Sequence, residues 1–286
     1  MIDAQAVAAT VHRVAVLLQA GLPPARAWEQ LSGTGEPVAA AIAARAAQGA
    51  ALGDAVTAGG GAWREVGTAW RVAETVGAPL AHSLRTIADA LRDAQASRDD
   101  VRVALAEPAA TARLIAWLPL AAAGLSALLG FDLVRALGHP LGIACVLCGL
   151  LLMLLARRWS GRLVARAQPD AVVPGLHTEI VAIALSAGVS IERALAVVAR
   201  AGGGEPTAEV VEVLALSRET GAPAVELLRA TAALERHAAR TEGRLRAARL
   251  SSRLLLPLGI CTLPAFLLLG VGPMLLSVLG AASPSL

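Results

Sequence analysis

Long apolar stretches without any charged residue are the most prominent pattern along the 286-residue chain. A helix needs about 20 mostly apolar residues to cross the hydrocarbon core of a membrane. Stretches of this kind cover residues 114–131, 141–156 and 254–282. With their flanking residues they predict three transmembrane helices, at about 112–132, 138–157 and 251–282.

Three prolines, Pro257, Pro264 and Pro273, interrupt the last of these stretches. A membrane helix tolerates proline when neighbouring groups satisfy the carbonyls that it leaves free. We therefore expect kinks at these positions and a helix that continues through them. Trp117 and Trp159 stand near the ends of the first two spans, where indole rings favour the membrane interface.

The two polar segments, residues 1–110 and 159–250, have the periodicity of helices. Val11, Val14 and Leu18 recur at intervals of three or four residues, which is typical of one buried helix face. No segment shows the alternation of apolar and polar residues, bounded by hairpin turns, that indicates strands. We therefore predict an all-α integral membrane protein in which both polar segments form helical bundles.

Arginine residues set the expected orientation. They crowd the end of the second span, from Arg157 onward, and the start of the third, up to Arg253. The positive-inside rule then puts both polar segments in the cytoplasm, with residues 132–139 and the tail 283–286 outside. The chain should be a multi-pass protein of the plasma (inner) membrane, with residues 111–158 forming a transmembrane hairpin.

The two polar segments contain the same short motifs in the same order, which indicates an internal repeat. An Ala-Gly pair ends one helix, and a Glu-Thr-(Val)-Gly-Ala-Pro turn precedes a long helix. A glycine ends a helix with left-handed dihedrals and a proline opens the next, so turn geometry explains these residues more simply than partner contact. The turn residues are Gly21, Glu74, Gly77 and Pro79 in the first copy, and Gly188, Glu219, Gly221 and Pro223 in the second.

A helical domain with these two turns, membrane spans, the same domain again and a last span resembles the type II secretion F family. That family supplies the inner-membrane platform proteins of type II secretion systems, type IV pili and tight-adherence pili. The compact first domain and the alanine- and arginine-rich composition resemble most the tight-adherence branch in actinobacteria. Ala224 stands where the first copy has Leu80, so the second turn departs from the pattern there.

The resemblance implies a function in assembly. A platform of this family would couple a cytoplasmic assembly ATPase to the polymerisation of pilin subunits, or to a similar form of secretion. It would lie in the lipid bilayer and associate with itself or with another platform protein. The alternative is the membrane-spanning subunit of an ABC-type transporter, which also needs a separate ATPase. Transporters usually carry ionisable groups inside their spans, and the three apolar stretches contain none.

The residues of common catalytic sites are missing from the chain. All 25 basic residues are arginine, so the lysine of a P-loop is absent. Cys145 and Cys148 lie within a span without a nearby histidine, which favours apolar packing over a metal site. His177 and Glu179 lack the downstream cysteine pair of a deaminase. We predict no catalytic residue, cofactor or metal and no enzymatic activity, and the few aromatic residues disfavour nucleic-acid binding.

Three arginines before the third span, Arg236, Arg240 and Arg244, recur at i, i+4 and i+8 and share one helix face. Between Pro223 and Arg253 the chain has seven arginines and three glutamates. These arginines could serve as a topology signal, bind anionic lipid or dock an acidic partner. We treat them as a candidate partner-docking face.

Overall fold

The computed structural model describes residues 4–128, 140–167 and 173–271. These residues are helical throughout, with short connecting turns and no strand among them, which confirms the all-α prediction for this part of the chain. They divide into two compact units, described separately below: residues 1–97 with 170–241, and residues 98–169 with 242–286. The expected outward link 132–139, Pro273 and the tail 283–286 lie outside the described residues.

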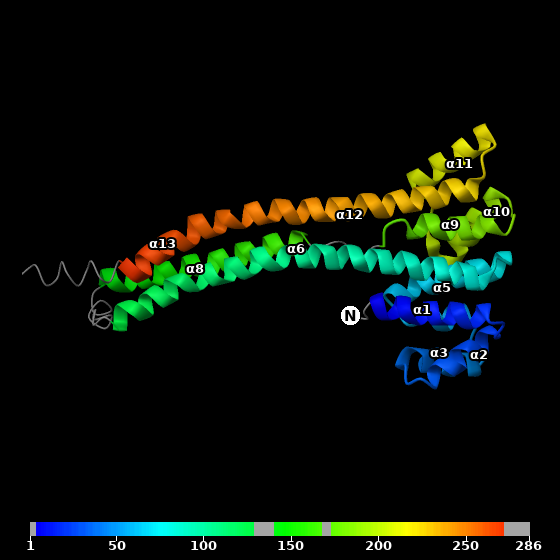
Figure 1. The fold of residues 1–286 in the computed structure, drawn as a ribbon, viewed down its shortest axis with the longest axis horizontal. Coiled ribbons are helices and arrows are strands. Elements are labelled where there is room, and N and C mark those ends of the chain that lie inside the picture. Colours follow the sequence, from blue (N-terminus) through cyan, green and yellow to red (C-terminus); the bar gives the residue numbers. More distant parts are fainter. Residues whose placement is uncertain (1–3, 129–139, 168–172, 272–286) are drawn as a thin grey trace, which may run out of the picture. The chain divides into compact units, whose positions relative to one another are not determined.

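The first unit draws its helices from both polar segments (Figure 1). The first segment supplies α1 (Ala4–Gln19), α2 (Pro24–Ser32), α3 (Pro37–Ala47), α4 (Leu52–Thr57), α5 (Ala62–Val76) and the start of α6 (Leu80–Leu128). The second segment supplies α9 (Leu176–Ser186), α10 (Ile191–Val198), the π-helical turn η1 (Ala199–Gly203), α11 (Ala208–Thr220) and the start of α12 (Ala224–Pro257).

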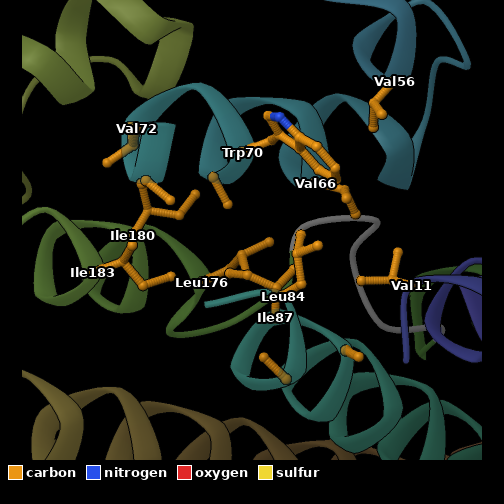
Figure 2. Close-up of a cluster of buried hydrophobic side chains, with 14 of the residues drawn as sticks. Val11, Val56, Val66, Trp70, Val72, Leu84, Ile87, Leu176, Ile180 and Ile183 are labelled. Carbon is orange, nitrogen blue, oxygen red and sulfur yellow. The ribbon is translucent and has the colours of Figure 1, made fainter. Parts of the chain in front are cut away.

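The core of this unit is shared between the two segments. Helix α9 packs against α5, and every residue of α9 from Thr178 to Leu185 is buried. A helix that is buried on all sides needs neighbours all round, and the first segment provides several of them. Apolar side chains from α5, α6 and α9 converge in Figure 2, including Val66, Val72, Leu84, Ile87, Leu176, Ile180 and Ile183.

This sharing differs from the expected domain organisation. The sequence predicted separate helical domains at residues 1–110 and 159–250, whereas the structure packs 1–97 and 170–241 around one core. Periodicity shows which face of a helix is buried, and it carries no information about the helix that covers that face.

Three tryptophans fill the part of the core that belongs to the first segment. The ring of Trp28 on α2 lies 6.0 Å from that of Trp63 and 6.2 Å from that of Trp70, both on α5. Helix α4 approaches α5 closely beside them because Gly67 has no side chain. A Cβ at Gly67 would collide with Oγ1 of Thr57 and would lie 2.8 Å from the carbonyl oxygen of Gly53.

The second unit contains the rest of α6, α8 (Pro140–Ala167) and the end of α12, followed by η2 (Leu258–Thr262), α13 (Leu263–Phe266) and η3 (Leu267–Val271). Val101, Ala247, Leu250 and Leu254 form a small apolar cluster in it. Gly149 on α8 lets Leu269 pack closely, since a Cβ there would lie 2.6 Å from Cγ of Leu269. Close approach at small residues is typical of helices that associate in membranes.

Two helical stretches among the described residues are long and apolar enough to cross a membrane, Gly142–Arg166 and Ala224–Leu269. Gly142–Arg166 overlaps most of the second predicted span, and Ala224–Leu269 overlaps the first part of the third but begins well before it. The first predicted span, at about 112–132, begins inside α6 and extends beyond the described residues at Leu128. The two candidate helices are consistent with a membrane protein, and the number of three spans stays a prediction.

The last helix continues through Pro257 and Pro264, as expected. Pro257 keeps helical dihedrals, with φ −63° and ψ −31°, and the π-helical segment η2 follows it directly. A proline has no N–H to donate to the preceding turn, so the hydrogen-bond pattern must change at this point. Figure 1 shows α12 curving into α13 there.

Candidate functional site

The four glycines of the repeated turns end their helices in the left-handed conformation. Their φ angles are 89° at Gly21, 77° at Gly77, 77° at Gly188 and 74° at Gly221. A Cβ at any of them would meet no atom within 4 Å, so the requirement for glycine comes from the backbone dihedral. Pro79 and Pro223 then stand directly before α6 and α12. The turns thus have the helix-ending geometry that the sequence indicates, and a further role in assembly stays a prediction.

The two motif glutamates have different surroundings. Glu74 lines a shallow hollow of about 260 Å³, together with Arg71, Thr75, Val197, Arg200 and Ala201. Arg71 donates a hydrogen bond to the carbonyl oxygen of Ala201 at 2.5 Å and pairs with Asp54 at 2.8 Å. The hollow is therefore bounded by an arginine that already holds α5 to η1. Glu74 and Glu219, which lies at the end of α11, are both exposed.

Arg236 and Arg240, which the sequence assigned to a docking face, are paired within the first unit. Nε of Arg236 lies 3.6 Å from Oδ2 of Asp93, and its Nη1 lies 3.5 Å from Oε2 of Glu179. Nη2 of Arg240 lies 3.7 Å from Oδ1 of Asp93. These pairs link α12 to α6 and α9, and only 19% of the Arg236 side chain is exposed.

Arg244 belongs to the second unit, where its Nη2 lies 2.7 Å from Oδ2 of Asp100 on α6. Its side chain is 62% exposed. All three arginines of the predicted docking face therefore have acidic partners in their own chain. The sequence could not show this pairing, because Asp93 and Asp100 are distant from the arginines along the chain. The role of these arginines as a partner-docking face stays a prediction.

Glu179 is the acidic centre of this network, a role that the sequence pattern around His177 and Glu179 did not indicate. Its side chain is 2% exposed and lies on α9 between Arg236 and Arg229, whose Nε is 3.9 Å from Oε1 of Glu179. Desolvation by burial raises the pKa of Glu179, and the attraction of Arg236 and Arg229 offsets only part of that effect. An acidic residue within an otherwise apolar helix was the signal that could have identified it.

Neighbouring polar contacts extend the network around Glu179. Oγ1 of Thr178 donates a hydrogen bond to Oε1 of Glu235 at 2.8 Å. Nη2 of Arg229 lies 3.2 Å from Nε2 of His82. A buried ion pair contributes little net stability, because desolvation offsets the attraction, but loss of one partner is costly. The network can thus fix the register of α6, α9 and α12.

Within the described part of the chain, no group of three His, Cys, Asp or Glu residues is placed to hold a metal ion. Cys145, Cys148 and Cys261 are free thiols.

The fold defines an all-helical protein with candidate membrane-spanning helices. Residues 10–126 match the family model for the type II secretion system (T2SS), protein F. The match supports the T2SS protein F family, whose members are structural platform proteins, and the family together with the two apolar helices fits an inner-membrane protein. No curated protein matches the chain.

The matched residues run from α1 to near the end of α6 and include the turn residues Gly21, Glu74, Gly77 and Pro79. The second set of turn residues lies beyond the match. The first copy of the predicted repeat is therefore the part of the chain that the family model covers.

Proposed function

We propose that the chain is an inner-membrane platform protein for type II-like secretion or pilus assembly. The observation that carries this proposal is the match of residues 10–126 to T2SS protein F. In this function the helical first unit lies in the cytoplasm and receives force from an assembly ATPase. The membrane spans gather pilin subunits, and the platform associates with itself or with a second platform protein.

The architecture of the first unit supports a mechanical role. Both polar segments share one core, so a load on either segment acts on the same packed body. Helices α6 and α12 each supply residues to both units. A load on the first unit can therefore pass along the continuous backbone of these two helices. The ion pairs from Asp93 and Glu179 to Arg236 hold these helices in one register.

The amino-acid composition favours the tight-adherence branch of the family and is typical of an actinobacterial genome. Every basic residue is arginine, and alanine is abundant, as in the members that the chain resembles. The comparisons give no support to the ABC-type transporter alternative, so a platform is the single function proposed here.

Deletion of the gene in its native host tests the proposal. Pilin on the cell surface, or the secreted substrate, should be lost, while the pilin precursor stays in the membrane fraction. Expression of the full chain from a plasmid should restore the surface form. Normal surface pilin and normal secretion in the deletion strain would overturn the proposal. Co-purification of the assembly ATPase with the full chain, and not with an unrelated inner-membrane protein, tests the coupling separately.

A further inference from the structure

Helices α5 and α11 occupy the same place in the two polar segments. Each ends at a left-handed glycine, Gly77 or Gly221, and is followed by a proline and a long helix. Their burial differs greatly. Helix α5 buries eight of its residues, and α4 covers part of its surface. Helix α11 buries only Val210 and Leu214.

Two exposed apolar residues of α11 stand at positions that are buried in α5. Val211 is 51% exposed and Leu216 is 48% exposed, and Ala215 is exposed beside them. With the Glu-Thr pairs at the helix ends aligned, Val211 and Ala215 fall where α5 has Val66 and Trp70. Both of those α5 residues are buried, with 0% and 1% exposure. A helix of 13 residues is marginally stable in water by itself, so an uncovered face of this kind favours a partner.

Acidic residues lie beside and between these exposed apolar side chains. Between Glu205 and Thr220 the chain has four glutamates and one arginine. The arginine, Arg218, is paired with Glu192 of α10 at 2.5 Å. Glu205, Glu212 and Glu219 are exposed, and Glu209 lies in the first turn of the helix. A hydrogen bond from the backbone N–H of Glu209 and one from the Thr207 hydroxyl lower the pKa of Glu209, so this carboxylate also stays ionised.

We propose that the outer face of α11, centred on Val211, Ala215 and Leu216, docks a basic amphipathic helix of another protein. Val211 and Ala215 lie one turn apart and form a short apolar ridge that suits packing against a second helix, while Leu216 lies on the other side of Glu212 and Glu219. The surrounding glutamates attract arginine or lysine and repel acidic partners. The basic face of α12 in a second copy of this chain does not fit this description, because Arg236 and Arg240 are bound to Asp93 and Glu179.

Photo-crosslinking in the native host tests the proposal with the full-length chain. A photo-crosslinking phenylalanine analogue replaces Leu216 in one strain and Val16 in a control strain. Val16 lies on α1 and is 44% exposed, so its accessibility matches that of Leu216. After irradiation, mass spectrometry identifies the crosslinked peptide. The expected product at Leu216 is a peptide of another protein that carries net positive charge and apolar residues at intervals of three or four.

A charge reversal separates docking at this face from chance contact. Glu212→Arg with Glu219→Arg should lower the yield of that adduct about tenfold, which corresponds to about 1.4 kcal/mol of binding free energy. The control Glu29→Arg with Glu65→Arg also reverses two exposed glutamates, on α2 and α5, and should leave the yield unchanged. A crosslinked peptide from this same chain, an acidic or uncharged peptide, a lipid adduct, or no adduct above the Val16 level would each overturn the proposal.

Discussion

Glu179 is a buried carboxylate whose ionisation is unfavourable in the folded chain, because desolvation outweighs the attraction of the nearby arginines. Its folded-state pKa is raised above the unfolded value, so its contribution to stability is complete below the unfolded pKa. That contribution is lost as the pH rises through the folded pKa. The titration of Glu179 therefore makes its own contribution to the pH dependence of the free energy of unfolding.

The variant Glu179→Gln removes the titratable carboxyl group, and with it this contribution to the pH dependence, while keeping the shape of the side chain. We expect the melting temperature of the variant minus that of the wild type to increase as the pH rises above 4.5, the ordinary pKa of glutamate, through the folded pKa of Glu179. Tryptophan fluorescence of the purified full chain during heating measures the melting temperatures of the variant and of the wild type. Glu29→Gln, at an exposed glutamate, is the control and should give a constant difference. A constant difference for Glu179→Gln as well would contradict the assignment.

Gly67 is predicted to be intolerant of any side chain. In Gly67→Ala the new methyl group would collide with Thr57 and crowd the carbonyl of Gly53, so α4 and α5 must separate. We expect a loss of about 1–3 kcal/mol in the free energy of unfolding, as for other overpacked sites. Denaturant unfolding followed by tryptophan fluorescence measures it.

Gly161→Ala on α8 is the matched control for this substitution. A Cβ at Gly161 meets no atom within 4 Å, and alanine is favoured over glycine in a helix by up to about 1 kcal/mol. This control should be neutral or stabilising. Equal losses for the two variants would show that the close approach of α4 to α5 is unimportant.

At the scale of elements, local sequence chemistry predicts most of the helices. The helix through Val11 and Leu18 ends at Gly21, and the next one opens at Pro24, because glycine and proline act on the backbone directly. Helix α4 was not predicted. It has six residues, and its packing depends on Gly67 of a neighbouring helix. The turn residues were likewise predictable from the sequence, whereas the ion pairs of Arg236 required the fold.

The network that joins α6, α9 and α12 should depend on Arg236 far more than on Arg244. Arg236→Ala leaves Glu179 buried with Arg229 as its remaining arginine, and loss of one partner of a buried pair costs about 3 kcal/mol. Arg244→Ala removes a more exposed pair with Asp100, which contributes less than about 1 kcal/mol. Free energies of unfolding of the two variants, measured side by side, test this order, and equal values would contradict it.

At the scale of the whole molecule, the sequence predicts the class of protein from the apolar stretches and the turn motifs. It does not predict that residues 1–97 and 170–241 share a core. The buried faces of α5 and α9 are visible in the sequence as apolar periodicity. Which two faces pair depends on the fold. Many helices of one chain have similar apolar faces, and periodicity does not distinguish between them.

The expected topology can be tested in intact cells. In a background without Cys145, Cys148 and Cys261, single cysteines replace Ser97 and Asp132. Because the positive-inside rule predicts that the arginines near the spans are cytoplasmic, an impermeant maleimide should label the cysteine at position 132 in intact cells. The cysteine at position 97 should react only after the membrane is opened. Labelling of both positions in intact cells would contradict the proposed orientation.

The shallow burial of α11 has a consequence for amide hydrogen exchange. Local opening of a helix costs free energy in proportion to the contacts that are lost, and α11 loses little beyond Val210 and Leu214. Its amides should therefore exchange deuterium well before those of α5, whose opening would expose Trp63 and Trp70. Mass spectrometry of peptides from these two helices would show the order. Slow exchange in α11 of the isolated chain would mean that its exposed face is already covered.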